Sequence, residues 1–250
     1  MTAGQPAERI SLGVVVARGA SKRLPRKNVR PLAGLPLVAW TCRAAMASKI
    51  DRVILSTEDA EIAEIGRAAG IEVPFTRPVA LAEDYARDTD ILLHAVDSAE
   101  EIYNERYRTV VLIQATTPFV RPEHFDACLD RQLSGGFNCV FLARKVEDHP
   151  RWMWTADDAG QAEPFMTGSL SADEQHSQNL RPVYYPNGAA WAIDLKTLRA
   201  REEVYCAPLG LVEAPAEFSV DIDDARDLAV AEAVAAECKI EPVAVRGEVK

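Results

Sequence analysis

The sequence predicts an α/β protein in which a mostly parallel sheet lies between two layers of helices. Short apolar runs rich in β-branched residues alternate with helical patterns along most of the 250 residues. Such alternation is typical of βαβ units, in which a helix returns the chain for the next parallel strand. The composition, 48% hydrophobic and 26% charged, suits one large soluble domain.

The alternation can be followed element by element from residue 10, after a segment at 1–9 that we expect to be a flexible N-terminus. Gly70 ends the second helical pattern, because glycine readily takes the backbone conformation found after helix ends. The predicted elements are strands at 10–17, 52–57, 109–114 and 138–144, and helices at 36–48, 58–70, 88–106 and 121–133.

The alternation of predicted strands and helices stops after Lys145, where a polar, turn-rich stretch begins. We interpret 146–190 as an excursion from the sheet, too long and too rich in aromatic residues for an idle loop. Asn187-Gly188 between two apolar runs predicts a β-hairpin. Sheet-like runs return at 207–215 and 218–223, followed by an Ala-rich helix from 224 to 238. Residues 239–250 are expected to form a tail, and the domain itself spans 10–238.

Bulk charge and cysteine usage exclude several classes of protein. The net charge of -10 argues against a broad surface for nucleic acid or anionic membranes. No stretch has the length or apolar character of a signal peptide or a membrane span, so we expect a cytoplasmic protein. The five cysteines are scattered, without ligand spacing, which favours buried free thiols over zinc or disulfides.

A cationic loop stands out against this acidic background. Six cations lie between Arg18 and Arg30 without an acidic residue among them, directly after the first predicted strand. Ligands of open α/β sheets bind beyond the carboxyl ends of strands, and Gly19 lets backbone amides approach a ligand closely. The loop therefore suits a polyphosphate, although a solvated basic loop is the alternative. It matches neither the P-loop nor the dinucleotide-binding pattern.

Two carboxylates near the C-terminus form a candidate metal site. Asp221 and Asp223 are two residues apart, so on a strand both would project to the same face. Together with a triphosphate they would suit Mg²⁺ or Mn²⁺. Such an ion typically binds one or two protein carboxylates, and water and phosphate oxygens supply its remaining ligands. The alternative is helix capping, which we favour for Asp224.

The residues of the cationic loop also carry a resemblance to a known family. The stretch 17–28, ARGASKRLPRKN, resembles the signature of the acylneuraminate cytidylyltransferases, the CMP-sialic acid synthetases and their relatives for other nonulosonic acids. The resemblance continues in family order through STEDAEIAEIGRAAGIEV, RPVALAED, HAV, LIQATTPF, YPNGA and SVDIDDARDL. It implies a Rossmann-like nucleotidyltransferase fold, with the excursion docking on a second subunit to form a homodimer.

The resemblance also implies roles for individual residues. Lys27 and Arg18 would stabilise charge on the α-phosphate and the departing pyrophosphate, and the Asp pair would hold the metal. The implied nucleotide-binding residues are Ala17, Arg18, Gly19, Ser21, Lys27, Asn28 and Arg77, and the implied acceptor-binding residues are Gln114, Asn187, Trp191 and Tyr185. Alternatives remain: a capping amide for Gln114, turn formation for Asn187, packing for His94, and surface positions for Lys22, Arg23 and Arg26.

Departures from the family pattern bear on the acceptor. Ser177 and Tyr185 stand where the family often has Arg, Trp191 where it has Tyr, and Trp152 near a frequent Lys. They favour an acceptor such as legionaminic, pseudaminic or a deaminated nonulosonic acid over N-acetylneuraminic acid. Arg87 and Asp88 replace small hydroxyl residues near the cytidine. The resulting hypothesis is CMP transfer from CTP to a nonulosonic acid. The alternatives are a related nucleotidyltransferase for a KDO-like acid, sugar phosphate or phosphonate, and a non-catalytic nucleotide-binding module.

Overall fold

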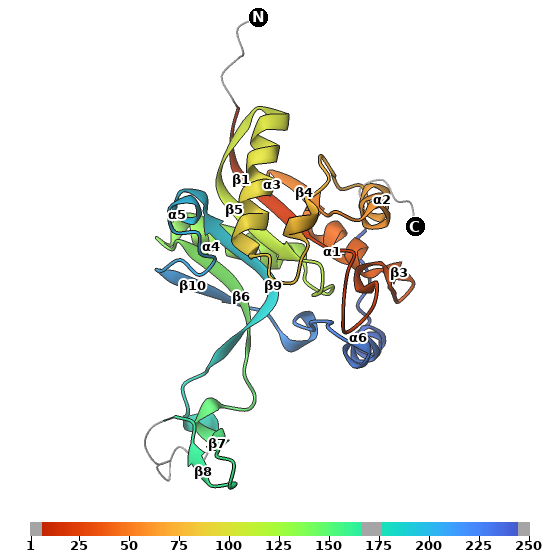
Figure 1. Ribbon diagram of the computed structural model, residues 1–250. Coiled ribbons are helices and arrows are strands. Elements are labelled where there is room, and N and C mark those ends of the chain that lie inside the picture. The colour runs from red at the N-terminus through yellow and green to blue at the C-terminus, as the bar shows by residue number, and fades with distance from the viewer. Residues whose placement is uncertain (1–6, 167–176, 245–250) are drawn as a thin grey trace, which may run out of the picture.

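One six-stranded sheet runs through the body of the molecule in the order β10-β6-β9-β5-β1-β4 (Figure 1). The computed structural model describes residues 7–166 and 177–244. The strands are β1 (Ala7–Val16), β4 (Arg52–Ser56), β5 (Glu105–Gln114), β6 (Cys139–Lys145), β9 (Tyr184–Asp194) and β10 (Leu209–Glu213). Within this sheet β9 alone runs antiparallel to its neighbours. The mostly parallel sheet of the sequence prediction is therefore confirmed.

Helices cover both faces of the sheet and complete the three layers. One face packs against α3 (Asp88–Tyr103) and α5 (Leu195–Arg201), and the other against α1 (Leu37–Met46), α2 (Ala60–Ala68) and α4 (Pro122–Ser134). In β1, Val14 joins the core under α3 while Val15 joins the core under α1 and α4. Successive side chains of a strand point to opposite faces, so a strand buried on both sides reads as a continuous apolar run.

A third, smaller core attaches the cationic loop to the C-terminal helix α6 (Ala225–Glu237). Leu24, from the middle of the loop, is 4% exposed and packs in the same cluster as Trp40, Ile222 and the buried alanines of α6. Asp224 caps α6 by accepting hydrogen bonds from the amides of Arg226 and Asp227, as expected. The loop continues through the short helix η1 (Lys27–Val29) and the strands β2 (Pro31–Leu32) and β3 (Leu35–Pro36).

The predicted hairpin at Asn187-Gly188 is wrong, because β9 passes through both residues as one strand. The strand pairs with β6 before these residues, at Tyr184–Pro186, and with β5 and β6 after them, from Ala190 onward, so the chain does not reverse; Gly188 takes the irregular backbone at φ +78°. The register on β6 shifts between Phe141 and Ala143, as in a β-bulge.

The predicted strand at 218–223 is also wrong. This segment leaves the short helix η6 (Ala216–Phe218) as extended chain outside the sheet. Val220 and Ile222 alternate as in a strand because both pack against the α6 core, and the amide of Ile222 donates to the carbonyl of Thr116. At the other end of the chain, β1 begins at Ala7, three residues before the predicted start.

The excursion forms an arm that projects from the body (Figure 1). Beyond the sheet, β6 and β9 continue as a two-stranded ribbon through the pairs Arg144–Tyr185 and Lys145–Tyr184. The arm contains η3 (Pro150–Trp152), β7 (Trp154–Ala156), β8 (Ala162–Pro164) and η5 (Ser177–Asn179). Its exposed apolar side chains include Met153, Trp154 and Phe165, so the arm carries surface suited to a partner.

Two further findings concern the cysteines and the question of membrane-spanning helices. All five cysteines are free thiols, and Cys238 is the exposed one. Burial raises the pKa of Cys42 to about 12, so this thiol is protonated and unreactive at neutral pH. In residues 7–166 and 177–244, no helix combines the length and apolar character that crossing a membrane requires.

A carboxylate at the start of β5 ties three strands together and leads to a stability prediction. Glu105, whose side chain is 6% exposed, accepts hydrogen bonds from Arg52 Nε (2.9 Å), Tyr107 (2.6 Å) and Arg9 Nε (3.0 Å). The Arg52 hydrogen bond, with help from Tyr107 and Arg9, lowers the pKa of Glu105 to about 2.

We expect Glu105→Gln to lower the free energy of unfolding by about 3 kcal/mol at neutral pH, because it removes the buried counter-charge that Arg9 and Arg52 share and leaves Arg52 only its more exposed partner Glu72. A lowered carboxyl pKa stabilises the fold above the ordinary value of 4.5, and this stabilisation is lost as the pH falls towards 2. Urea unfolding at several pH values should show a shallower acid dependence for the variant. Glu101→Gln, at an exposed position, is the control, and equal stability of the two variants would contradict the prediction.

Candidate active site

The carboxyl ends of three parallel strands meet at one edge of the sheet. Val16 at the end of β1 pairs with Ser56 of β4 on one side and Gln114 of β5 on the other. The cationic loop and the loops after β4 and β5 therefore leave the sheet side by side. The location predicted for the cationic loop is confirmed.

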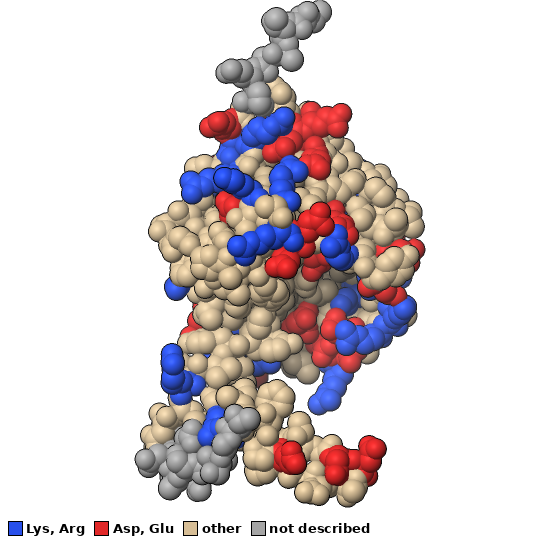
Figure 2. Space-filling model, turned by 60° about the vertical axis from the view of Figure 1, so that its left-hand side comes forward, with Lys and Arg blue, Asp and Glu red and all other residues tan. Residues whose placement is uncertain are grey.

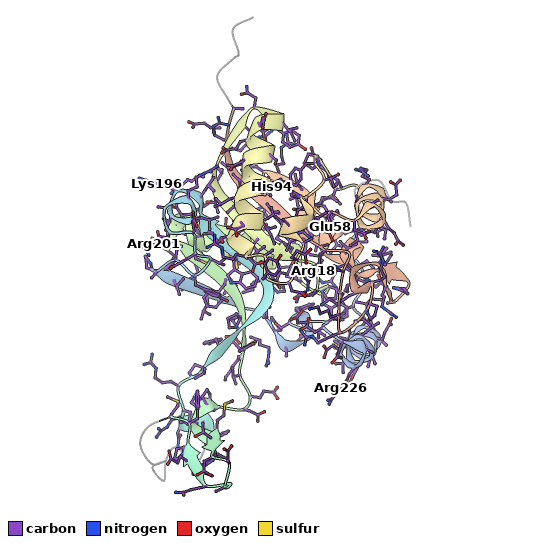
Figure 3. The ribbon with its side chains drawn as sticks, in the orientation of Figure 1. Arg18, Glu58, His94, Lys196, Arg201 and Arg226 are labelled. Carbon is purple, nitrogen blue, oxygen red and sulfur yellow. The ribbon has the colours of Figure 1, made fainter. Side chains whose placement is uncertain are left out.

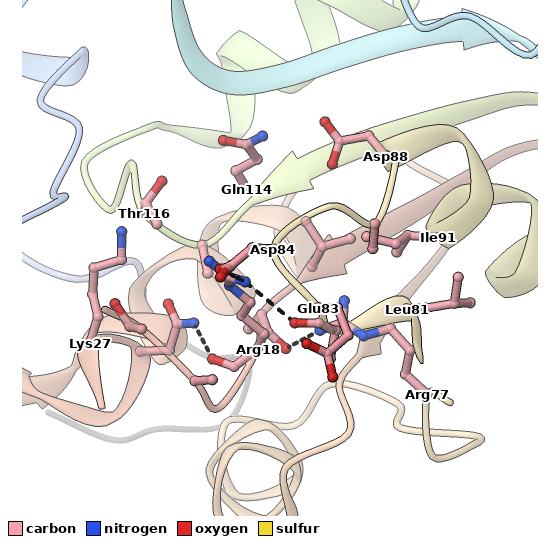
Figure 4. Close-up of a pocket in the computed structure, with 18 residues that line it drawn as sticks. Arg18, Lys27, Arg77, Leu81, Glu83, Asp84, Asp88, Ile91, Gln114 and Thr116 are labelled. Atoms are coloured by element: carbon pink, nitrogen blue, oxygen red, sulfur yellow. Dashed lines mark hydrogen bonds and ion pairs between the residues drawn. The ribbon is translucent and has the colours of Figure 1, made fainter. Parts of the chain in front are cut away.

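These loops enclose a cavity of about 230 Å³ (Figure 4). The structure brings together around it most of the nucleotide-binding residues implied by the resemblance, together with Gln114. They are Ala17, Arg18, Ser21, Lys27 and Asn28 from the cationic loop, Arg77 from the segment before α3, and Gln114 from the end of β5. Leu81 and Ile91 add an apolar side.

Glu58, directly after β4, joins two parts of this cavity. One carboxylate oxygen accepts the amide of Gly19 at 2.7 Å, and the other accepts the guanidinium of Arg77 at 2.8 Å. Arg77 is 2% exposed and also donates to the carbonyl of Ala17, so its charge is satisfied within the wall. Figure 3 shows Arg18 and Glu58 on neighbouring loops at this edge. A side chain at Gly19 would collide with Asp59, which explains the glycine.

Carboxylates from other elements neutralise the cationic loop. Arg18 pairs with Asp84 at 2.7 Å, and Lys22 contacts the same carboxylate. Lys27 and Arg23 share Asp223, at 2.9 and 2.6 Å. Arg26 is held by Asp59 and Glu61. The expected surface cations Lys22, Arg23 and Arg26 are thus exposed but paired, and Figure 2 shows cationic and acidic side chains interspersed rather than gathered by sign.

The Asp pair lies at the border of this cavity, although its segment is not a strand. Burial raises the pKa of Asp221, and a hydrogen bond from Thr116 partly opposes this effect. Burial also favours a higher pKa for Asp223, but Lys27 and Arg23 outweigh it and hold that pKa below its ordinary value. Within the described ranges, no group of three or more His, Cys, Asp or Glu residues is arranged to hold a metal alone. A metal at this pair would take its remaining ligands from water or from a bound molecule.

A second cavity, of about 450 Å³, adjoins the first. Asp221 lines the second cavity, Thr116 lines the first, and the amide of Ile222 binds the carbonyl of Thr116 at 2.9 Å. The implied acceptor residues Asn187, Trp191 and Tyr185 all lie in its wall, whereas Gln114 lies in the first cavity. The site thus has a cationic compartment and an aromatic compartment that meet beside a carboxylate.

Comparison with known proteins shows the family. Residues 12–208 match the model of the family described as cytidylyltransferase. The chain belongs to this family. It is also 31% identical to the CMP-N,N'-diacetyllegionaminic acid synthase of Legionella pneumophila, over 88% of this chain and 94% of that protein.

Other relatives of this cytidylyltransferase carry related names. It is 28% identical to the pseudaminic acid cytidylyltransferase of Campylobacter jejuni, over 87% of this chain and 93% of that one. It is 30% identical to the N-acylneuraminate cytidylyltransferase of Streptococcus agalactiae, over 86% of this chain but 50% of that protein. A solved CMP:2-keto-3-deoxy-manno-octonic acid synthetase in complex with CTP shares the fold, with a TM-score of 0.65 at 16% identity, over 91% and 99% of the two chains.

Two residues of the cytidylyltransferase, whose roles the sequence did not decide, are held in place by packing and hydrogen bonds. Asn187 is 4% exposed, donates to Ser219 Oγ at 3.1 Å and accepts the amide of Ala189 at 3.1 Å. It therefore shapes the cavity wall, and the turn proposed for it does not form. His94 packs edge-on against Phe75, with ring centroids 5.0 Å apart, as expected.

The positions that depart from the family pattern separate into different environments. Asp88 lines the first cavity, and burial raises the pKa of its carboxyl (Figure 4). Arg87 points away and pairs with Asp90 and Glu202 on the surface. Trp152 packs against His149 in the arm, and Trp191 packs edge-on against Tyr205 in the second cavity.

The sequence analysis missed the acidic partners of the site. Glu58 and Asp59 follow β4 as directly as the cationic loop follows β1, so the rule that found one loop could have found the other. Asp84 gives no comparable signal, because it reaches Arg18 only through the folding of the segment before α3.

The role of Glu58 gives a prediction for nucleotide affinity. We expect Glu58→Gln to lower the free energy of unfolding by about 2 kcal/mol and to weaken CTP binding roughly tenfold, because a buried Arg77 loses its counter-charge. Calorimetric titration with CTP and thermal unfolding measure both effects. Glu61→Gln is the control, since Glu61 contacts Arg26 on the surface and should change either quantity little. Equal behaviour of the two variants would refute this role.

Proposed function

We propose that this cytidylyltransferase transfers CMP from CTP to the anomeric hydroxyl of a nonulosonic acid, a 3-deoxy-2-ulosonic acid, and releases pyrophosphate. The observation that carries the proposal is the pair of adjoining cavities, one lined by Arg18 and Lys27 and the other by aromatic side chains, which meet at Thr116 and Asp221. The names of the legionaminic, pseudaminic and N-acylneuraminic acid relatives support the acceptor class.

The first cavity would hold CTP. Lys27 and Arg18 would contact the phosphates, with the small residues Ala17 and Ser21 allowing close approach to the loop backbone. The phosphates must displace Asp84 from Arg18 and Asp223 from Lys27, so binding exchanges one anion for another. Before the nucleotide arrives, the carboxylates hold the cations in place, so the cations are already oriented when the exchange occurs.

Asp221 and Asp223 fit a role in binding Mg²⁺ or Mn²⁺ together with phosphate oxygens. Mg²⁺ commonly takes one or two carboxylates and completes its octahedron with water and substrate phosphate, which agrees with a pair of carboxylates beside the cationic cavity. A bound ion would neutralise phosphate charge and lower the repulsion between the two carboxylates.

The residues of the chain would then orient the two reactants. Gln114 lies in the first cavity at the end of β5, where its amide would contact a sugar between nucleotide and acceptor. The anomeric hydroxyl would attack the α-phosphorus in line while pyrophosphate leaves. Lys27, which is 8% exposed and lines the first cavity, would stabilise the developing charge.

Pyrophosphate release provides the direct test of the proposed function. Purified protein with Mg²⁺ and each nucleoside triphosphate should release pyrophosphate from CTP only when a nonulosonic acid is present. Turnover undiminished by EDTA would contradict the metal requirement. Activity confined to a KDO-like acid, a sugar phosphate or a phosphonate would show that the proposed acceptor is wrong. CTP binding without turnover of any acceptor would indicate a nucleotide-binding module.

The Asp pair can be tested with a neighbouring control. We expect Asp221→Asn and Asp223→Asn each to lower kcat by roughly 10²-fold or more, because the phosphate-binding site loses a carboxylate ligand. Asp224→Asn should keep wild-type rates, since Asn caps a helix as well as Asp does. Circular dichroism checks folding. Wild-type activity of a folded Asp221/Asp223 double variant would exclude the metal role.

We also propose that the arm forms the contact of a homodimer. Its exposed Met153, Trp154 and Phe165 would be covered by a second copy. Light scattering at micromolar concentration should give twice the chain mass of 27.4 kDa, and Trp154→Ser with Phe165→Ser should shift the mass towards one chain. A wild-type mass near 27.4 kDa would refute the dimer.

The aromatic second cavity supports a prediction about the acceptor. Trp191 and Tyr205 offer apolar area that suits a more deoxygenated and acylated sugar than N-acetylneuraminic acid. We expect kcat/KM to be at least tenfold higher for legionaminic, pseudaminic or a deaminated nonulosonic acid. The comparison uses identical CTP and Mg²⁺, and a higher value for N-acetylneuraminic acid would overturn the prediction.

A further inference from the structure

Among the residues that the structure describes, Arg144 has no acidic partner, unlike the cations of the nucleotide cavity. Arg18, Lys27 and Arg77 are each paired with a carboxylate at 2.9 Å or less. Arg144 is half-buried near the end of β6, and no ion pair is formed by it within the described part of the chain. Its guanidinium lies over the ring of Tyr185, 5.5 Å from the ring centroid. A permanently charged group held in this way is prepared for an external anion.

The second cavity is where this charge is presented. Among the described residues that line it, Arg144 and Asp221 are the charged ones, and the rest of the wall is aromatic, uncharged polar, proline or glycine. Arg144 and Tyr185 are directly opposed across the β6–β9 ribbon, so their side chains share one face. The cavity therefore suits an occupant with a single anionic group and a bulky, weakly polar body. A dianionic phosphate ester would exceed the one available positive charge.

We propose that Arg144 binds the carboxylate of the acceptor, an inference that rests on the proposed function and adds to it the residue that recognises the acid. A guanidinium and a carboxylate form two parallel hydrogen bonds, which fix direction as well as distance. The carboxyl carbon of a 2-ulosonic acid is bonded to the anomeric carbon, so holding the carboxylate also orients the attacking hydroxyl.

The test compares Arg144→Gln and Arg144→Lys with Lys145→Gln. Lys145 is the next residue of β6, is exposed, and does not line the second cavity, so it is a matched control for charge. Pyrophosphate release is measured against acceptor concentration at saturating CTP, and against CTP concentration at saturating acceptor. We expect Arg144→Gln to lower kcat/KM for the acceptor roughly 100-fold with the KM for CTP within twofold of wild type. Arg144→Lys should recover part of the loss, and Lys145→Gln should match wild type.

The methyl ester of the acceptor tests the same contact without changing the protein. Wild type should have a far lower kcat/KM for the ester than for the acid. For Arg144→Gln, the kcat/KM values of ester and acid should differ little. Wild-type kinetics for a folded Arg144→Gln, or equal use of acid and ester by the wild type, would overturn the assignment while leaving the proposed function in place. Failure of the wild type to use any nonulosonic acid with CTP would instead overturn the proposed function, and the assignment with it.

Discussion

The cationic loop can be ordered without a ligand because carboxylates from distant parts of the chain neutralise it. Glu58 after β4, Asp84 before α3 and Asp223 before α6 contact the loop or its neighbour Arg77. Leu24 anchors the same loop in the core beneath α6. Apolar packing thus fixes the path of the backbone, and ion pairing fixes the charged side chains. This dependence explains why an acidic protein can maintain a concentrated positive site.

The same pairing sets the terms on which an anion binds. A triphosphate that enters the first cavity replaces existing partners of Arg18 and Lys27, so the net gain is smaller than the charge of the loop suggests. Preorganisation offsets this cost, because the cations need not be ordered during binding. The second cavity differs, because in residues 7–166 and 177–244 no acidic side chain pairs with Arg144, whose guanidinium lies over the ring of Tyr185.

The antiparallel strand β9 links the second cavity to the arm. It pairs with β5 and β6 in the sheet, carries Asn187 and Trp191 into the cavity wall, and continues into the ribbon that supports the arm. Arg144 and Tyr185 form one of the pairs of this ribbon and also line the second cavity. The second cavity and the arm are therefore connected by a single continuous strand.

The sequence by itself determined the parallel core and the cationic loop, because both depend on local pattern. The apolar run ending at Val16 specifies a buried strand, and the residues that follow a strand in such a sheet must lie at its ligand-binding edge. The capping role of Asp224 was equally local. Motif order was enough to indicate the family, since it spans both the loop and the Asp pair.

Only the tertiary structure decided the path of the chain after Lys145 and the pairing of the charges. Asn-Gly has a strong local preference for a turn, but β9 pairs with its neighbours before and after Asn187 and Gly188, and this pairing carries the chain through them without a reversal. The alternation of Val220 and Ile222 resembles a strand, although it arises from packing against α6. Arg18 meets Asp84, and Lys27 meets Asp223, through contacts between segments far apart in sequence. Such long-range contacts have no local signature, because their energies depend on where the fold brings each side chain.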